Sequence, residues 1–387
     1  MNSAFAEPTS AVTDATFPGT VFVRQRLLPE YRAKLFDLVA QQCSGGCVIA
    51  AGKPTKKEAT HIQSQLQTAT VVELNQKTIL SGVLETYYQF GLKKILSNSL
   101  PDIFVTNPNP RMLDSYFTTR YLRKKGVPCV ALGIGTTDFW DQPFKKIRRW
   151  YRQTFLSQFD GFLCYGSKAA QQYADLGISA DRIITVYNSV VPRPSGPPRT
   201  RPTEFADGKA KVVTIGRLIA SKGFDRLIHA AKIAADQGTN IEVWIVGDGP
   251  EKSNLEQLAA ETKSPVKFLG RQTGDTLAET CFQSDLFVLP GLGGLAIQEA
   301  MAHALPVIVT QADGTELDLV RENGWIVEKE NVKALASVLT DAISDPGKLR
   351  IKGEESFRIV QDEINLELMA QRFVAGICQI SELGMRD

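Results

Sequence analysis

Short apolar runs alternate with segments of helical periodicity along both halves of this 387-residue chain. A strand buried in a parallel sheet is a short apolar run, and the amphipathic helix after it carries apolar residues roughly every three or four positions. The alternation predicts an α/β protein, and the length predicts two doubly wound domains rather than one. In such sheets a ligand binds beyond the carboxyl ends of the strands.

The apolar runs give the expected strands of each half. In the first half they lie at 20–23, 47–51, 70–74, 102–106, 128–132 and 161–165, and helices are expected at 31–42 and 84–96. In the second half they lie at 211–216, 241–247, 266–270, 286–290, 306–310 and 324–327. The helices of the second half are expected at 224–236, 251–262, 295–304, 331–344, 346–361 and 366–380.

A stretch rich in proline and polar residues interrupts this pattern at 190–210 and predicts a domain boundary. We expect a first domain over residues 1–194, a linker over 195–208 and a second domain over 209–365. The remaining segment, 366–387, carries a helical pattern of its own.

Charge is divided unevenly between the halves. Residues 1–200 hold 24 Lys+Arg against 14 Asp+Glu, whereas the remainder holds 20 against 28. The basic half predicts an anionic surface or substrate as its partner. We expect a cytoplasmic protein, because no apolar run is long enough to span a membrane, the N-terminus lacks the pattern of a secretory signal, and the six scattered cysteines suggest reduced thiols.

Arg217 and Lys222 lie between the strand expected at 211–216 and the helix expected at 224–236. A loop in this position lies at the carboxyl edge of the sheet, where two cations can neutralise a diphosphate. Judged by spacing alone, an exposed loop with two ordinary surface cations explains the segment equally well.

A second loop, Pro290–Gly294, is rich in glycine and precedes the helix expected at 295–304. The free N–H groups of a helix N-terminus form a ready site for an anion. Glu299 lies about one turn inside this helix, where its carboxylate can accept hydrogen bonds from the two hydroxyls of a ribose. The alternative is that Glu299 only provides a favourable charge near the helix N-terminus.

Four segments in this order resemble the donor half of family 4 retaining glycosyltransferases of the GT-B fold. They are GRLIASKGFDRLI, VWIVGDGP, VKFLGR and the block EAMA…PVIVT…E, and together they cover roughly residues 211–340. The resemblance implies two Rossmann-like domains that face a cleft, with the C-terminal helix over 366–387 crossing back to pack on the first domain.

The resemblance also implies a nucleotide-sugar donor, linked to UDP or GDP, and a metal-independent reaction. Arg217 and Lys222 would bind the donor diphosphate and stabilise it as it leaves, and Glu299 would bind the ribose. The remaining donor-binding residues that it implies are Gly216 in the first loop, Arg271 near the base, Gly293, Gly294 and Leu295 at the phosphate or the sugar, and Glu316 as a later glutamate of the family pattern.

The chain departs from the family pattern in two places. Gly291 stands where the family has the first glutamate of a pair, a carboxylate that commonly contacts the transferred sugar. In the first half, the histidine often found after a central strand is missing, and Asp138 is the nearest polar candidate for a catalytic role. Gly133 and Gly135 would let the backbone approach a ligand there, although Asp138 is equally well explained as a solvated loop acid.

The segment 143–159 predicts an amphipathic helix that alternates aromatic and basic residues. Such a helix can lie on an anionic membrane surface. The alternative is an apolar stripe that faces the core, with a solvated basic face opposite. No recognition motif for nucleic acid accompanies the basic residues.

Together these observations predict a retaining hexosyltransferase that acts on a glycolipid or saccharide acceptor in surface polysaccharide or glycolipid synthesis, at the cytoplasmic face of a membrane. Two alternatives stay open. One is a nucleotide-sugar epimerase of the same fold. The other is a non-catalytic nucleotide-binding subunit, which the glycine at position 291 suggests.

Overall fold

The computed structural model describes residues 15–54, 63, 65–80, 85–135 and 145–384, and the chain divides into two compact units. Unit 1 consists of Met1–Val190 and Leu366–Asp387, and unit 2 consists of Val191–Asn365. The prediction that the C-terminal helix joins the first domain is therefore confirmed.

The segment 195–208, expected as a linker, lies inside unit 2. Its residue Arg201 donates hydrogen bonds to the backbone carbonyls of Ser284, Cys281 and Ala304, at 3.1, 2.9 and 3.1 Å. These three bonds tie the segment to the body of unit 2, which the proline-rich composition did not indicate.

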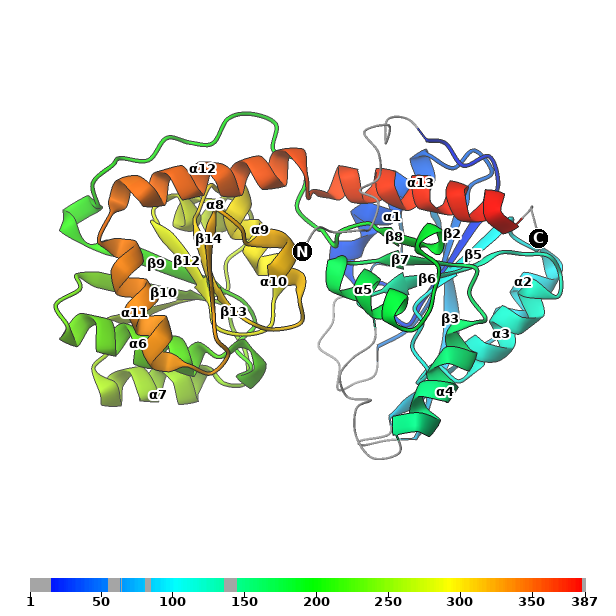
Figure 1. The fold of residues 1–387 in the computed structure, drawn as a ribbon, viewed down its shortest axis with the longest axis horizontal. Coiled ribbons are helices and arrows are strands. Elements are labelled where there is room, and N and C mark those ends of the chain that lie inside the picture. Colours follow the sequence, from blue (N-terminus) through cyan, green and yellow to red (C-terminus); the bar gives the residue numbers. More distant parts are fainter. Residues whose placement is uncertain (1–14, 55–62, 64, 81–84, 136–144, 385–387) are drawn as a thin grey trace. The chain divides into compact units, whose positions relative to one another are not determined.

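The described part of unit 1 contains an eight-stranded sheet in the order β4-β3-β2-β1-β5-β6-β7-β8 (Figure 1). All neighbouring strands are parallel except β3 and β4. The strands are β1 Val21–Gln25, β2 Cys47–Gly52, β3 Thr70–Leu80, β4 Thr86–Phe90, β5 Ile103–Thr106, β6 Cys129–Gly133, β7 Gly161–Cys164 and β8 Ile183–Thr185. The helices are α1 Ala33–Gln41, α2 Leu92–Asn98, α3 Asp114–Arg123, α4 Lys145–Leu156, α5 Ser167–Asp175 and α13 Leu366–Gly384.

The single helix expected over 84–96 is wrong, because the segment contains the strand β4 followed by the helix α2. Gly91 separates the two elements with a φ of 86°, a left-handed conformation that a continuous helix does not allow. Thr86, Tyr87 and Tyr88 are residue types that favour strands, and β4 pairs antiparallel with β3 at the edge of the sheet.

Helix α13 is held on unit 1 by close packing against the sheet and against α1 (Figure 1). Its apolar face is buried, and Phe373, Ile377 and Ile380 are fully inaccessible to solvent. A side chain at Gly376 would come within 2.6 Å of Leu163 on β7, so the helix lies directly on the strands.

Unit 2 contains a six-stranded parallel sheet in the order β11-β10-β9-β12-β13-β14 (Figure 1). The strands are β9 Ala210–Ile215, β10 Ile241–Val246, β11 Val266–Gly270, β12 Leu286–Leu289, β13 Val307–Thr310 and β14 Gly324–Val327. This is the doubly wound order in which the winding direction reverses between the first and fourth strands, here β9 and β12. The topology therefore places a crevice for a ligand between the carboxyl ends of β9 and β12.

The helices of unit 2 are α6 Phe224–Asp236, α7 Lys252–Thr262, α8 Gly274–Phe282, α9 Gly294–Ala302, α10 Thr315–Leu319, α11 Val332–Ile343 and α12 Pro346–Asp362. Five of them lie where helical periodicity predicted them. The short helices α8 and α10 were not predicted from the sequence. No helix in the described part of the chain is long and apolar enough to cross a membrane.

Candidate functional site

The loops after β9 and β12 meet at the point where the sheet of unit 2 reverses its winding. The backbone N–H of Leu292 donates to the carbonyl of Ser221 at 3.1 Å. A side chain at Gly291 would begin only 2.5 Å from the backbone carbonyl carbon of Lys222. The two loops, Gly216–Gly223 and Pro290–Gly293, thus lie backbone to backbone, and position 291 has no room for the glutamate of the family pattern.

Lys222 extends over the start of α9. A Cβ at Gly293 would collide with the Lys222 Nζ, and Gly293 also has a φ of 155°, which favours glycine. Both observations explain the glycine at this position. The ammonium group consequently lies against the backbone that begins the helix.

The beginning of α9 is open for an anion. Its N-cap residue is Gly293, and no side chain caps the helix with a hydrogen bond. The N–H of Ala296 donates to the carbonyl of Gly293 at 3.1 Å, so the N–H groups of Gly294 and Leu295 are the donors that this turn offers to an anion, close to the Lys222 ammonium. This combination suits phosphate oxygens.

Burial lowers the pKa of Lys222, and the nearby carboxylate of Asp313 opposes that change. The side chain is only half-buried, so the site keeps access to water. A bound phosphate would raise this pKa again, because an opposite charge favours the protonated amine.

The other residues expected at the diphosphate and the base lie at the same edge of the sheet. Arg217 is exposed in the loop directly after β9 and Gly216. A Cβ at Gly247 would collide with the carbonyl oxygen of Gly216, so the loop after β10 closes tightly on the loop after β9. Arg271 is exposed directly after β11, two strands away from β9.

Glu299 and Leu295 lie on α9 itself. The side chain of Glu299 is 38% exposed, and its Oε1 lies 3.6 Å from the Nε2 of His303, one turn further along the helix. An ion pair forms there only when the histidine is protonated. Leu295 is half-buried in the first turn, next to Gly294.

Glu316 takes a role that the sequence did not suggest. Its side chain is buried, and its two carboxylate oxygens accept hydrogen bonds from the backbone N–H groups of Ala312 and Gly314, at 2.9 and 2.8 Å. A Cβ at Gly294 would lie 2.7 Å from the Oγ1 of Thr315. Glu316 therefore shapes the loop after β13, and this loop touches the first residue of α9.

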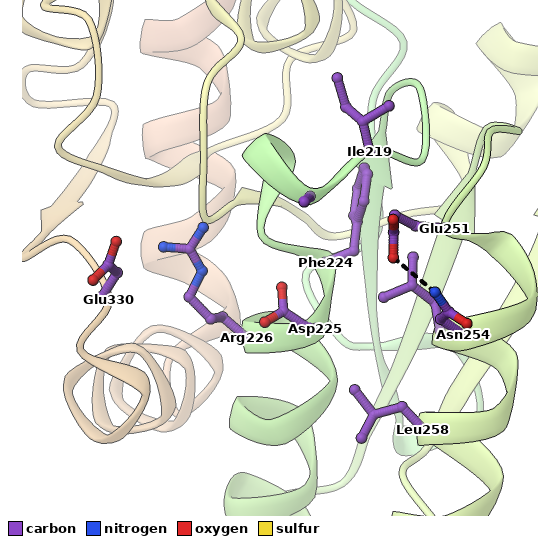
Figure 2. A pocket seen from close by; sticks show the side chains of 10 residues that line it. Ile219, Phe224, Asp225, Arg226, Glu251, Asn254, Leu258 and Glu330 are labelled. Carbon is purple, nitrogen blue, oxygen red and sulfur yellow. Dashed lines mark hydrogen bonds between the residues drawn. The ribbon is translucent and has the colours of Figure 1, made fainter.

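A cavity of unit 2 lies beside this site, since Ile219 and Ala220 of the loop after β9 belong to its lining. It has a volume of about 450 Å³ and is lined by residues of α6, α7 and the segment before α11. Three carboxylates and one guanidinium surround it, from Asp225, Glu251, Glu330 and Arg226 (Figure 2). Their net charge is negative, so the cavity is a poor place for a diphosphate despite its size.

Unit 1 has a cavity of about 380 Å³ at the corresponding position in its own sheet, beyond the carboxyl ends of β1 and β5. Its lining includes Arg26, Tyr31, Asn107, Asn109 and Met112. The mixture of amides, a guanidinium and apolar side chains suits a hydroxylated ligand with an apolar part.

A buried charged network lies beneath this cavity and was missed by sequence reasoning. Arg24, at the end of β1, is 1% exposed, and its Nη2 lies 2.5 Å from the Oδ2 of Asp114 on α3. Its other nitrogens donate to the Oε1 of Gln89, at 2.7 Å, and to the Oγ of Ser115. An arginine directly after the apolar run Val21–Val23 was the available signal. Asp138, the catalytic candidate of the first half, lies outside the described residues.

Residues 199–357 match the protein family described as glycosyl transferases group 1. Over 178 residues the chain is 29% identical to the GDP-mannose-dependent monoacylated alpha-(1-6)-phosphatidylinositol monomannoside mannosyltransferase of Corynebacterium glutamicum. That alignment covers 43% of this chain and 47% of the relative, so the chain spans about half the length of the curated relative that it matches.

Two solved structures are similar over nearly the whole chain. Sucrose-phosphate synthase from Thermosynechococcus elongatus has a TM-score of 0.69 at 16% identity and covers 94% of this chain and 99% of its own. Anabaena Alr3699/HepE in complex with UDP has a TM-score of 0.67 at 15% identity and covers 93% and 99%. These similarities and the two Rossmann-like units confirm the fold class expected from the sequence.

Proposed function

Because residues 199–357 form a glycosyl transferases group 1 domain within a protein of the GT-B fold, we propose that the chain transfers a sugar from a nucleotide-diphosphate donor to a glycolipid or saccharide acceptor, with retention of configuration. One observation carries the proposal. The Lys222 ammonium lies against the open N-terminus of α9, at the point where the sheet of unit 2 reverses its winding.

The proposed chemistry stabilises a leaving diphosphate. The bond between the anomeric carbon and the phosphate oxygen breaks, a bond to the acceptor oxygen forms on the same face, and the acceptor proton passes to the departing phosphate. Lys222, Arg217 and the first N–H groups of α9 oppose the negative charge that develops on the phosphate. Glu299 would hold the ribose, and Arg271 would lie near the base.

We assign the acceptor to the cavity of unit 1. Its lining includes two arginines, Arg26 and Arg24, and the charge of Arg24 is opposed by its ion pair with Asp114. The amides of Asn107 and Asn109 can hydrogen-bond to sugar hydroxyls. By its name, the Corynebacterium glutamicum relative acts on a phosphatidylinositol monomannoside. A glycolipid acceptor for this chain agrees with the +10 balance of residues 1–200.

The experiment is a donor-consumption assay. The protein is incubated with UDP-linked and GDP-linked sugars, with and without a lipid extract as the acceptor source. We expect release of the nucleoside diphosphate only when acceptor is present, and a glycosylated lipid with the anomeric configuration of the donor. A new nucleotide sugar formed without acceptor would instead indicate an epimerase. Binding without any turnover would indicate a non-catalytic subunit.

A glycolipid acceptor requires contact with a membrane, for which α4 is the proposed surface, on the cytoplasmic face. Trp150 on this helix is 66% exposed, whereas Phe155 and Phe159 are buried in the core. The C-terminal part of the predicted apolar stripe therefore faces the core. Within the described side chains of α4, the part available to a membrane is around Trp150.

We expect the protein to sediment with anionic vesicles, and much less with neutral ones. Changing Lys145, Lys146, Arg148 and Arg149 to glutamine should abolish most of this binding, because each basic residue near an anionic bilayer contributes about 1 kcal/mol. Donor affinity should be unchanged. The measurement is sedimentation with vesicles at low salt.

The matched control changes four exposed lysines of unit 2 to glutamine. They are Lys263, Lys329, Lys333 and Lys348. This variant loses the same formal charge and should still bind the anionic vesicles. Equal losses in both variants would show that net charge, and not the surface of α4, drives the binding.

A further inference from the structure

The loop after β13 forms one wall of the anion site in unit 2. Strand β13 neighbours β12 in the sheet, so this loop leaves the same edge as the loop Pro290–Gly293. The first residue of α9, Gly294, is so close to Thr315 that an added Cβ would lie 2.7 Å from the threonine Oγ1. Thr315 is the first residue of α10, which follows this loop directly, so the start of α10 is in direct contact with the N-terminus of α9.

Asp313 is held rigidly in this wall. Its Oδ1 accepts hydrogen bonds from the backbone N–H of Thr315 at 3.1 Å and from the Thr315 hydroxyl at 2.6 Å. Glu316 fixes the residues on either side by accepting from the N–H groups of Ala312 and Gly314. The side chain of Asp313 is nevertheless exposed, so its Oδ2 is accessible to a ligand.

A continuous set of contacts connects Asp313 with the phosphate-binding ammonium. Lys222 lies against Gly293, the next residue Gly294 touches Thr315, and Thr315 donates to Asp313. The negative charge of Asp313 acts on Lys222, since it raises the pKa of the lysine against the larger lowering by burial. The two opposite charges thus share one small region of the surface.

A carboxylate in this position repels phosphate and attracts hydroxyl groups. In a nucleotide-diphosphate sugar, the sugar is attached to the terminal phosphate. The hydroxyls of this sugar therefore lie no further than the width of one sugar ring from the phosphate that the Lys222 ammonium binds. Neither Gly291 nor Gly293 of the facing loop has room for a side chain, so these two positions offer only backbone to the sugar.

We propose that Asp313 is a specificity-determining residue, whose Oδ2 accepts hydrogen bonds from hydroxyls of the sugar that is transferred. This role rests on the proposed function, sugar transfer from a nucleotide-diphosphate donor, and makes Asp313 the residue that selects the donor sugar. Hydrogen bonds to a charged acceptor are stronger than those to a neutral one, so the carboxylate favours donors that present hydroxyls to it.

The test compares the affinity for a nucleotide sugar with the affinity for the bare nucleotide. Asp313→Asn keeps an oxygen that can accept from Thr315, removes the charge and replaces the acceptor Oδ2 with an amide nitrogen that donates. By calorimetry with UDP, GDP, UDP-glucose and GDP-mannose, we expect the affinity for the bound nucleotide sugar to fall about tenfold. The affinity for the matching nucleoside diphosphate should hold or rise, because a negative charge near the phosphates is removed.

Two further variants keep the result interpretable. Asp345→Asn is the matched control, because Asp345 is also exposed and its Oδ1 also accepts a backbone N–H, from Lys348 at 3.0 Å, at the start of α12. It should alter neither affinity. Asp313→Ser keeps a hydroxyl for the turn but is shorter, and it should reproduce the selective loss of Asp313→Asn.

The outcomes distinguish the role of Asp313 in sugar selection from the proposed function as a glycosyltransferase. An equal loss of both affinities in the Asp313 variants, or no change in either, overturns the role of Asp313 and leaves the proposed function standing. A wild-type protein that binds none of the four nucleotides overturns the proposed function, and the assignment of Asp313 falls with it.

Discussion

Asp114→Ala is expected to lower the free energy of unfolding of unit 1 by about 3–5 kcal/mol, the cost of leaving a buried charge without its partner. The partner is Arg24, which is 1% exposed and lies 2.5 Å from the Asp114 carboxylate. Burial already lowers the pKa of Arg24, and Asp114 is the charge that opposes this lowering. Denaturant unfolding followed by fluorescence measures the loss, provided that the transitions of the two units are separated.

The matched control for this loss is Asp236→Ala on α6. Asp236 pairs with Lys232 at the surface, and its side chain is 61% exposed. A surface pair of this kind contributes about 1 kcal/mol or less. The double variant Arg24→Met/Asp114→Leu removes both charges together and should recover part of the lost stability. A loss below about 1 kcal/mol in Asp114→Ala, similar to the control, would show that the buried pair is not what stabilises unit 1.

Lys222→Ala is expected to weaken nucleoside-diphosphate binding by about 1.5–3 kcal/mol, which corresponds to roughly 10- to 150-fold. The reason is the loss of an ammonium that lies against the N-terminus of α9 and would form charge-assisted hydrogen bonds with phosphate. The fold should be little affected, because the lysine makes its close contacts with backbone and remains half-buried. Lys232→Ala serves as the control, because Lys232 lies on α6, is also half-buried and pairs with Asp236 away from the loops.

The lowered pKa of Lys222 gives this binding a pH dependence with a definite sign. A lysine whose pKa is lowered loses its proton at a lower pH than an ordinary lysine. The affinity of the wild-type protein should therefore fall as the pH rises through this lowered pKa, and that part of the pH profile should be missing in Lys222→Ala. An identical profile in both proteins would show that Lys222 does not contact the phosphates.

The sequence predicted the sheet of unit 2 well because its strands are short, mostly apolar runs, and the four central strands β10, β9, β12 and β13 are buried along most of their length. Every expected strand of that unit lies within one residue of the observed one at each end. The prediction from the sequence failed for β4, because the aromatic residues of this edge strand are followed directly by the helical pattern of α2. The conformation of Gly91 decides that boundary, and a helical periodicity does not reveal it.

Only those residues of the candidate site that belong to a recognisable sequence motif could be predicted. Arg217, Lys222 and the glycines before α9 follow strands directly, so their place at the sheet edge could be derived. Arg24 and Asp114 lie 90 positions apart, and nothing in their local sequence indicates that they form a pair. Asp313 is an ordinary loop residue until the fold brings its loop against Gly294, and Glu316 was expected at the ligand although its carboxylate is occupied by its own loop.

The phosphate site of unit 2 can be tested by calorimetric titration of the wild-type protein and of Lys222→Ala with UDP and GDP. We predict that one of the two nucleotides binds to the wild-type protein at one site per chain, and that the same nucleotide binds Lys222→Ala roughly 10- to 150-fold more weakly. If neither nucleotide binds the wild-type protein, or if the variant binds equally well, the phosphate site between the loops after β9 and β12 is contradicted.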